Sequence, residues 1–410
     1  MTKSIRVACV GPAQSVQGGI SRVIELISAH LPSRISFHPI ATFTRYTGYK
    51  GTAPHERGNR LEQVFVFVLA FIRVLTLALG RRTVFHVHFA DRGSILRKGI
   101  VCVVLRSLRC QYVVHSHVAD TTLFHEWLPL RCQRILLWGI SGAGKVIVLT
   151  QFWHDYYASL LNLQASQLLL LPNPANLPKS IPDRSTREGL RLLFLGRVGK
   201  RKGAFDLIRA LAALPEEIRS RCHLTMAGDG DINEARRLAA ALGCVNEVTI
   251  PGWVGTSEVD RLLEESDVLL LPSYAEGMAM ALLEGMSWGL PVVTTNAGGA
   301  GEFLDQGRNC ILVAPGDVQG ISHAISDLER DPALRQNLGL AARETIRRFS
   351  IESYISTLTG VYEELAIGLP GNQSLLVPAP QGNREALVPT VSHAADGADS
   401  IALMESMARK

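Results

Sequence analysis

The segment DVLLLPSYAEGMAMALLEGMSWGLPVV, residues 267–293, holds the order of elements that decides the fold. It opens with a short apolar run, passes through a loop into a helical pattern, and returns to a second short apolar run at Pro291. A strand, a helix and a strand joined in this way predict a crossover between two parallel strands of one sheet.

The same alternation of strand and helix patterns occurs in two series along the chain. The predicted strands of the first series are IRVACVG (5–11), VFHVH (84–88), QYVVH (111–115) and KVIVLT (145–150). Those of the second series are LRLLFLG (190–196), CHLTMAG (222–228), EVTI (247–250), DVLLLPS (267–273) and PVVTT (291–295). Each series predicts one doubly wound, parallel α/β sheet.

The domain organisation follows from the break between the two series. The segment PNPANLPKSIPDRSTREG (172–189) is polar, contains four prolines and is typical of a linker. We therefore expect an N-terminal Rossmann-like domain over residues 1–180 and a C-terminal one over 181–350, followed by a helix over 351–367 that packs back on the first. Residues 370–410 contain four prolines and no aromatic residue, so a mostly disordered tail is expected over 368–410.

Cysteine usage indicates a reducing compartment. The seven cysteines lie between Cys9 and Cys310 and form no C-x-x-C pair, which argues against a disulfide framework or a zinc site. The first residues, MTKSIRVACVGP, lack the apolar run of a signal peptide. We expect a cytoplasmic protein, and we expect no nucleic-acid partner.

The first half of the chain is strongly basic over one stretch. Residues 45–109 hold twelve Lys and Arg against three acidic residues, a local charge of +9 in a chain whose net charge is +5. Inside this stretch lies VFVFVLAFIRVLTLALG (64–80), an apolar run interrupted by Arg73. The basic residues that flank the run are Arg57, Arg60, Arg81 and Arg82.

Three interpretations of residues 64–80 stay open. The pattern fits a helix buried against a sheet, and it also fits a helix that lies on an anionic membrane surface. A membrane-spanning helix is the weakest of the three, because a span needs about 20 apolar residues.

A cationic, glycine-rich loop follows the predicted strand LRLLFL. GRVGKRKG (196–203) places Arg197 and Lys202 on a turn that opens a helix. Glycines allow the backbone to approach an anion closely, and a helix N-terminus with two cations favours a diphosphate. The alternative is a solvated basic loop.

Two carboxylates lie eight residues apart after the strand DVLLLPS. Glu276 is expected in the loop between strand and helix, and Glu284 about two turns inside the helix. A carboxylate accepts hydrogen bonds from vicinal hydroxyls, which fits a ribose or a hexose. The amides of Gly277 to Ala279 would face a phosphate or sugar oxygen at the start of the helix. The alternative for Glu284 is a surface charge, although its neighbours are apolar.

Two weaker signals come from the N-terminal half. Gly18 and Gly19 follow the first strand, where turn chemistry alone explains a pair of glycines about as well as a ligand does. His115 and His117 follow another strand with a spacing of two. Since no third ligand cluster is evident in the sequence, we predict no metal site.

The glycine-rich loop followed by Glu276-x7-Glu284 resembles the family-4 retaining glycosyltransferases of GT-B fold, over roughly residues 5–367. VHFADRGSILRKG (87–99) and VVHSHVAD (113–120) are similar to segments of members that assemble bacterial exopolysaccharides on lipid carriers. The resemblance implies an α/β protein in which two Rossmann-like, doubly wound parallel-sheet domains face a central cleft.

The resemblance also implies roles for particular residues. Arg197 and Lys202 would hold the donor diphosphate, Glu284 would bind the ribose, and Glu276 and His117 would lie at the transferred sugar. The residues implied in catalysis are Glu276, His117, Arg197 and Lys202. Those implied in donor binding are Gly18, Gly19, Gly196, Arg197, Lys202, Gly277, Met278, Ala279, Glu284 and Glu302.

The implied reaction transfers a hexose from a nucleotide-diphosphate sugar, with retention, to a saccharide or a polyprenyl-diphosphate-linked acceptor. The family is thought to use front-face attack without a metal, and we expect no cofactor. Met278 and Met280 occupy variable positions, so the sugar stays open. The alternatives are a sugar-nucleotide epimerase of GT-B fold and a non-catalytic subunit that binds sugar nucleotides.

Overall fold

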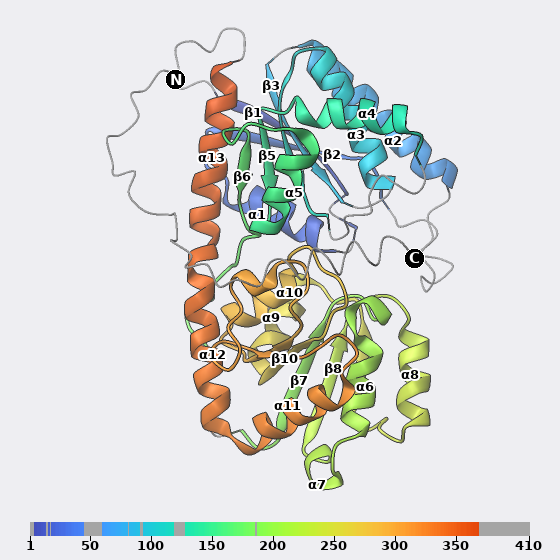
Figure 1. The fold of residues 1–410 in the computed structure, drawn as a ribbon, viewed down its shortest axis with the longest axis vertical. Coiled ribbons are helices and arrows are strands. Elements are labelled where there is room, and N and C mark those ends of the chain that lie inside the picture. Colours follow the sequence, from blue (N-terminus) through green and yellow to red (C-terminus); the bar gives the residue numbers. More distant parts are fainter. Residues whose placement is uncertain are drawn as a thin grey trace. The chain divides into compact units, whose positions relative to one another are not determined.

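The computed structural model describes residues 4–13, 15–16, 18–44, 60–80, 82–90, 93–118, 128–184 and 187–368. Within these residues the chain forms two parallel sheets of six strands each (Figure 1). The prediction of two doubly wound α/β sheets is therefore confirmed. Of the tail expected over 368–410, residues 369–410 lie outside the described residues, as do Arg57 and Arg81.

The first sheet has the strand order β2-β1-β3-β4-β5-β6. Its strands are β1 (Ile5–Gly11), β2 (Ile35–Ala41), β3 (Thr83–Phe89), β4 (Gln111–Ser116), β5 (Lys145–Val148) and β6 (Leu168–Leu170). Its helices are α1 (Gly19–His30), α2 (Arg60–Leu79), α3 (Gly93–Ser107), α4 (Leu130–Ser141) and α5 (Gln151–Leu161). The strand order reverses between β1 and β3, and such a switch point opens a crevice at the carboxyl ends of the strands.

The second sheet has the order β12-β11-β10-β7-β8-β9 and reverses between β7 and β10. Its strands are β7 (Leu190–Leu195), β8 (Cys222–Ala227), β9 (Val248–Gly252), β10 (Val268–Leu271), β11 (Val292–Thr294) and β12 (Ile311–Leu312). Its helical segments are η2 (Lys200–Lys202), α6 (Ala204–Ala212), α7 (Glu216–Arg219), α8 (Ile232–Ala241), α9 (Thr256–Glu265), α10 (Met280–Ser287), η3 (Ala300–Glu302), α11 (Val318–Arg330) and α12 (Pro332–Ile346).

The last helix, α13 (Ile351–Ile367), follows a short 3-10 turn, η4 (Arg347–Phe349), and packs on α1 and on strands β1, β3 and β4 of the first sheet. Its buried residues include Tyr354, Leu358 and Tyr362, which belong to a continuous apolar core shared with the second sheet. The opposite face of the first sheet has a separate core beneath α2, α3 and α5. The chain therefore crosses between the sheets twice, and the two crossings pair at Ala175 and Ser350.

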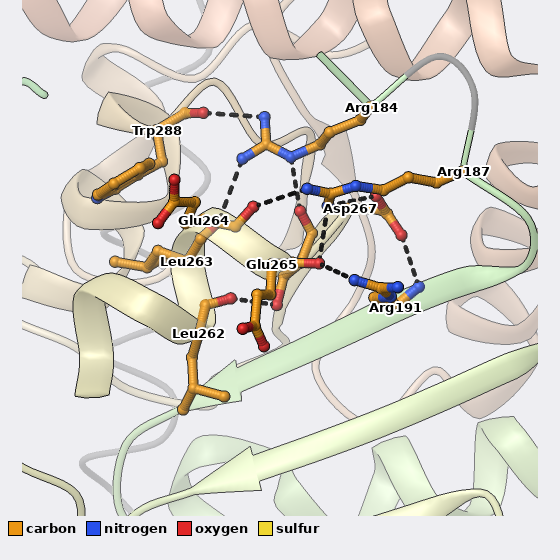
Figure 2. Close-up of polar contacts among 10 residues, drawn as sticks. Arg184, Arg187, Arg191, Leu262, Leu263, Glu264, Glu265, Asp267 and Trp288 are labelled. Carbon is orange, nitrogen blue, oxygen red and sulfur yellow. Dashed lines mark hydrogen bonds and ion pairs between the residues drawn. The ribbon is translucent and has the colours of Figure 1, made fainter. Parts of the chain in front are cut away.

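The linker after β6 is anchored by two arginines (Figure 2). Arg184 donates to the carbonyl oxygens of Leu263, Ser266 and Trp288 at 3.1, 2.7 and 3.2 Å. Arg187 donates to the carbonyl of Glu265 and to the carboxylate of Asp267. Guanidinium groups at the C-terminal carbonyls of α9 favour this helix end, where the dipole is negative. The linker is thereby fixed to the second sheet.

Candidate functional site

A cavity of about 690 Å³ lies at the carboxyl ends of strands from both sheets. Residues that follow β1, β3, β4 and β5 form one part of its wall, and residues that follow β7, β8 and β10 form the other. Its volume lies within the range of ligand sites, about 300–1,000 Å³. The geometry agrees with the rule that doubly wound sheets bind ligands at this edge.

The cavity brings together most of the residues singled out in the sequence. Those that line it are Gly18, Gly19, His117, Gly196, Arg197, Lys202, Glu276, Gly277, Met278, Ala279 and Glu284. They come from two sheets and from positions up to 266 residues apart, from Gly18 to Glu284. Glu302 is not among the lining residues.

The cationic turn lies between β7 and α6. Gly196 has a φ of +142°, a conformation that L-residues rarely adopt, and a Cβ there would stand 3.7 Å from Cε of Lys202. Arg197 pairs with Asp229, with Nη2 and Oδ2 3.2 Å apart, and both side chains are mostly buried. Asp229 lies two residues after the end of β8. The sequence analysis missed it, although its place after a predicted strand was the available signal.

Glu276 lies in the loop after β10 and faces the cationic turn. Its carboxylate pairs with the ammonium of Lys202, and Arg201 approaches to 4.0 Å. Burial by itself would raise the pKa of Glu276, but Lys202 and then Arg201 hold it below the ordinary value. Glu276 is therefore an ionised hydrogen-bond acceptor at neutral pH, and Lys202 is held at the wall of the cavity.

The loop around Glu276 also contacts the first sheet. A Cβ at Gly277 would lie 2.9 Å from the carbonyl oxygen of Val118, which is closer than side chains tolerate. Val118 follows His117 after β4. Glycine at position 277 is therefore required for the backbones of the two halves to approach each other at the cavity.

Glu284 lies in the second turn of α10, one turn nearer the helix start than the sequence predicted. The helix begins at Met280 because Ala279 is still extended, with φ −70° and ψ 120°. Oε1 of Glu284 accepts a hydrogen bond from Nε of Arg22 at 3.3 Å, across from α1. Burial raises the pKa of Glu284, and Arg22 partly offsets this effect.

Arg22 is the functional residue that sequence reasoning missed most clearly. It lies three residues after Gly19, on α1, and also pairs with Glu25 at 3.0 Å. No local pattern distinguishes it from an ordinary surface arginine of an amphipathic helix. Its position opposite Glu284 arises only from the approach of α1 to α10.

His115, on β4, and His117, directly after it, have different surroundings. His117 lines the cavity, whereas His115 is fully buried inside the first sheet. Nε2 of His117 lies 3.0 Å from Nδ1 of His88 on β3. Burial lowers the pKa of His117 to about 3, so the imidazole is neutral at physiological pH. It is able to exchange hydrogen bonds with a sugar but not to act as a cation.

Glu302, which the resemblance places beside the nucleotide, lies outside the lining of the cavity in this structure. Its carboxylate accepts hydrogen bonds from the backbone N–H groups of Gln151 and Phe152, at 2.9 and 3.1 Å. These groups form the N-terminus of α5, where unpaired N–H donors and the helix dipole favour a negative charge. Glu302 is therefore engaged in holding the second half of the chain to α5.

A protein-family model matches the part of the chain that forms the second sheet. Residues 182–345 match the family model described as "Glycosyl transferases group 1". We call these matching residues the group 1 domain. The domain carries Arg197, Lys202, Glu276 and Glu284, and thus the cationic turn and both carboxylates of the cavity.

Relatives by sequence align with about half of the chain. Glycogen synthase of Mycobacterium tuberculosis is 29% identical over 218 residues, which cover 51% of this chain and 51% of that protein. The lipopolysaccharide core biosynthesis glycosyltransferase LpsE of Rhizobium meliloti is 32% identical over 181 residues, 44% of this chain and 50% of that protein. The chain thus spans about half the length of these relatives.

The solved structures extend the likeness of the group 1 domain to the first sheet. Anabaena HepE, solved in complex with UDP-glucose, superposes with a TM-score of 0.68 at 17% identity, over 88% of this chain and 99% of that one. The fold of both sheets together is therefore GT-B, as the sequence predicted.

Proposed function

We propose that the chain is a retaining glycosyltransferase that moves a hexose from a nucleotide-diphosphate sugar to an acceptor hydroxyl without a metal. One observation carries the proposal: Arg197, Lys202, Glu276 and Glu284 line a single cavity of suitable size. The group 1 domain holds all four. The relatives named above are glycosyltransferases, and HepE was solved with UDP-glucose, which supports a nucleotide sugar as donor.

The charges of the cavity suit the parts of such a donor. Arg197 and Lys202 would bind the diphosphate, and the Glu284 carboxylate would accept hydrogen bonds from the ribose hydroxyls. Glu276, held ionised by Lys202, would accept hydrogen bonds from the hexose. Because the cations are held in place by carboxylates before the donor arrives, they need little reorganisation when the diphosphate departs.

The proposed step breaks the bond between the anomeric carbon and the diphosphate oxygen. The acceptor oxygen bonds to that carbon from the same face, and its proton passes to the departing diphosphate. Arg197 and Lys202 stabilise the negative charge that develops on this leaving group. His117, neutral and at the cavity wall, would position the hexose by hydrogen bonding.

The product's anomeric configuration tests this mechanism. Incubation with UDP-glucose and other nucleotide sugars, with a saccharide acceptor, should give a product that keeps the axial configuration of the donor. Proton NMR of the first-formed glycoside measures it. An equatorial product would reject the retaining mechanism, and epimerised donor formed without acceptor would favour an epimerase instead.

We further propose a lipid-linked saccharide as acceptor, reached from the cytoplasmic face of a membrane. The support is α2, which packs only one stripe, with Ala70, Val74 and Ala78, on the first sheet. Its other face exposes apolar side chains, with exposed fractions from 45 to 76%. They are Leu61, Val64, Phe65, Val68, Leu69, Ile72 and Leu79.

The helical segment Leu61–Leu79 is long and apolar enough to cross a membrane by length and composition. Only 17% of its most apolar 18-residue stretch is buried within the protein. Helix α3 packs against both α2 and α4. α4 exposes Leu130, Ile135 and Trp138 beside two arginines, Arg131 and Arg134. An exposed apolar face accompanied by arginines favours binding parallel to an anionic lipid surface. α2 thus packs on the sheet along one stripe, as a buried helix would, but leaves its opposite face exposed.

Liposome flotation tests the membrane contact. Wild type should float with vesicles that contain anionic phospholipid, and Val68→Glu with Leu69→Glu should reduce the floated fraction at least tenfold without lowering Tm. Leu340→Glu on α12, at a leucine of 51% exposure, is the matched control and should float like wild type. Equal flotation of all three proteins, or none of the wild type, would remove the membrane contact and leave a soluble acceptor.

A further inference from the structure

Four histidines gather on adjacent strands of the first sheet, apart from the group 1 domain. His86 and His88 alternate along β3, and His115 is on β4 with His117 directly after it. His88 and His115 are partners in the parallel register between the two strands, so their side chains leave the same face of the sheet. This face is the one that α13 covers.

Three of these histidines are buried without enough hydrogen-bond partners. His86, His88 and His115 have no exposed surface. Nδ1 of His86 lies 2.6 Å from the hydroxyl of Tyr362, and Nδ1 of His88 lies 3.0 Å from Nε2 of His117. Among the described residues, Nε2 of His86, Nε2 of His88 and both ring nitrogens of His115 have no hydrogen-bond partner. Buried polar atoms of this kind are rare and require an explanation.

Ring nitrogens of the three buried histidines lie close to one another. One ring nitrogen from each of His86, His88 and His115 lies within 4.8 Å of the others. The ring centroids of His86 and His88 are 4.0 Å apart, and those of His88 and His115 are 4.9 Å apart. If His86 and His88 each carry their proton on Nδ1, both Nε2 atoms keep a free lone pair. This tautomer is the one that a metal-binding histidine adopts when its second nitrogen donates a hydrogen bond.

We propose that His86, His88 and His115 bind a divalent transition-metal ion that prefers imidazole, such as Zn²⁺. A cation at this point would satisfy the nitrogens that no protein group reaches. Burial keeps all three imidazoles neutral, as ligands must be. Zinc–nitrogen bonds of about 2.0–2.1 Å require the rings to turn about their Cβ–Cγ bonds, because the nitrogens must draw closer than they now lie.

The contacts beyond the three ligands fit the same interpretation. Ligating histidines usually donate their second N–H to a neighbouring acceptor, and Tyr362 and His117 occupy these positions for His86 and His88. The site would therefore tie β3, β4 and α13 together. Through His88 it would also fix the tautomer of His117, leaving the proton of His117 on Nδ1. This inference does not depend on the proposed transfer reaction.

Metal analysis of the untagged, full-length protein tests the site. Mass spectrometry should find about one zinc or similar ion per chain, and Co²⁺ added to the chelator-stripped protein should give the visible absorption of histidine-bound Co²⁺. His115→Phe should lose both signals. His323→Gln, at an exposed histidine of α11, is the matched control and should keep them. Wild type that neither contains nor takes up metal would overturn the proposal.

Thermal denaturation distinguishes a histidine cluster that binds metal from one that does not, even where a variant loses activity. With a metal bound, dipicolinate should lower the Tm of wild type by several degrees and leave that of His115→Phe unchanged. Without a metal, an apolar ring in place of His115 should keep or raise Tm, because the two unpartnered nitrogens of His115 are then removed. His86→Leu provides a second variant should His115→Phe not fold.

Discussion

The two halves of the cavity wall are built in different ways. The second sheet supplies its groups from contiguous motifs: Arg197 and Lys202 from one turn, Glu276 and Glu284 from one loop and its helix. The first sheet supplies Arg22 and His117, which lie 95 residues apart on α1 and after β4 and belong to no common motif. The comparison indicates that the half proposed to bind the donor is encoded locally and the other half only by tertiary packing.

The largest expected effect tests the motif-built half. Lys202→Ala or Arg197→Ala should lower kcat by about 10²–10³-fold, because each removes a preorganised cation from the developing charge of the leaving group. Steady-state kinetics with a nucleotide sugar and acceptor measures the loss, and circular dichroism should show an unchanged fold. Lys200→Ala, an exposed lysine of the same 3-10 turn, is the control and should retain wild-type turnover. Normal rates in either cavity variant would refute the diphosphate role.

A second, smaller effect is expected for Glu284 and Arg22, which contact each other across the two halves of the cavity wall. Glu284→Gln should raise KM for the donor about 10–100-fold with less change in kcat, because the ribose loses a charged acceptor. Arg22→Ala should act on the same step, since Arg22 positions the carboxylate of Glu284. Glu25→Gln removes the other, more exposed partner of Arg22 and should have little effect. Changes in kcat alone would place Glu284 at the reacting sugar instead.

The pH dependence of kcat/KM tests the interaction between Arg22 and Glu284 further. Burial raises the pKa of Glu284 and Arg22 lowers it, so the raised value already includes the benefit of Arg22. Donor binding requires the ionised carboxylate, and kcat/KM should therefore fall on the acid side as Glu284 becomes protonated. Arg22→Ala removes the opposing charge and should move this acid limb to higher pH. An acid limb that stays in place, or moves to lower pH, would show that Arg22 does not control the ionisation of Glu284.

The smallest expected effect concerns Glu302, where the resemblance and the structure differ. Glu302→Ala removes the acceptor at the N-terminus of α5 and should cost about 1 kcal/mol of stability, a Tm decrease of a few degrees. KM for the donor should stay within about twofold of wild type. Asp327→Ala in α11, at an exposed acidic residue away from the cavity, serves as comparison. A large rise in KM without a change in Tm would return Glu302 to the nucleotide site.

The sequence alone determined the fold class and the half of the site in the group 1 domain. Parallel strands carry their carboxyl ends to one edge, so residues just after Leu195 and Leu271 had to meet there. It could not determine the partners of these residues. The Lys202–Glu276 and Arg197–Asp229 pairs join separate loops, and no spacing rule connects them.

Tertiary structure decided everything that depends on two distant segments meeting. It placed Arg22 opposite Glu284 and set the Glu302 carboxylate at the N-terminus of α5. It also exposed one face of α2 and brought His86 and His88 beside His115. Only the pair His115 and His117 was singled out in the sequence, and a metal site was set aside for want of a third ligand. The physical reason is common to all four: side-chain direction follows the local backbone, but the group it meets is set by the register and packing of other elements.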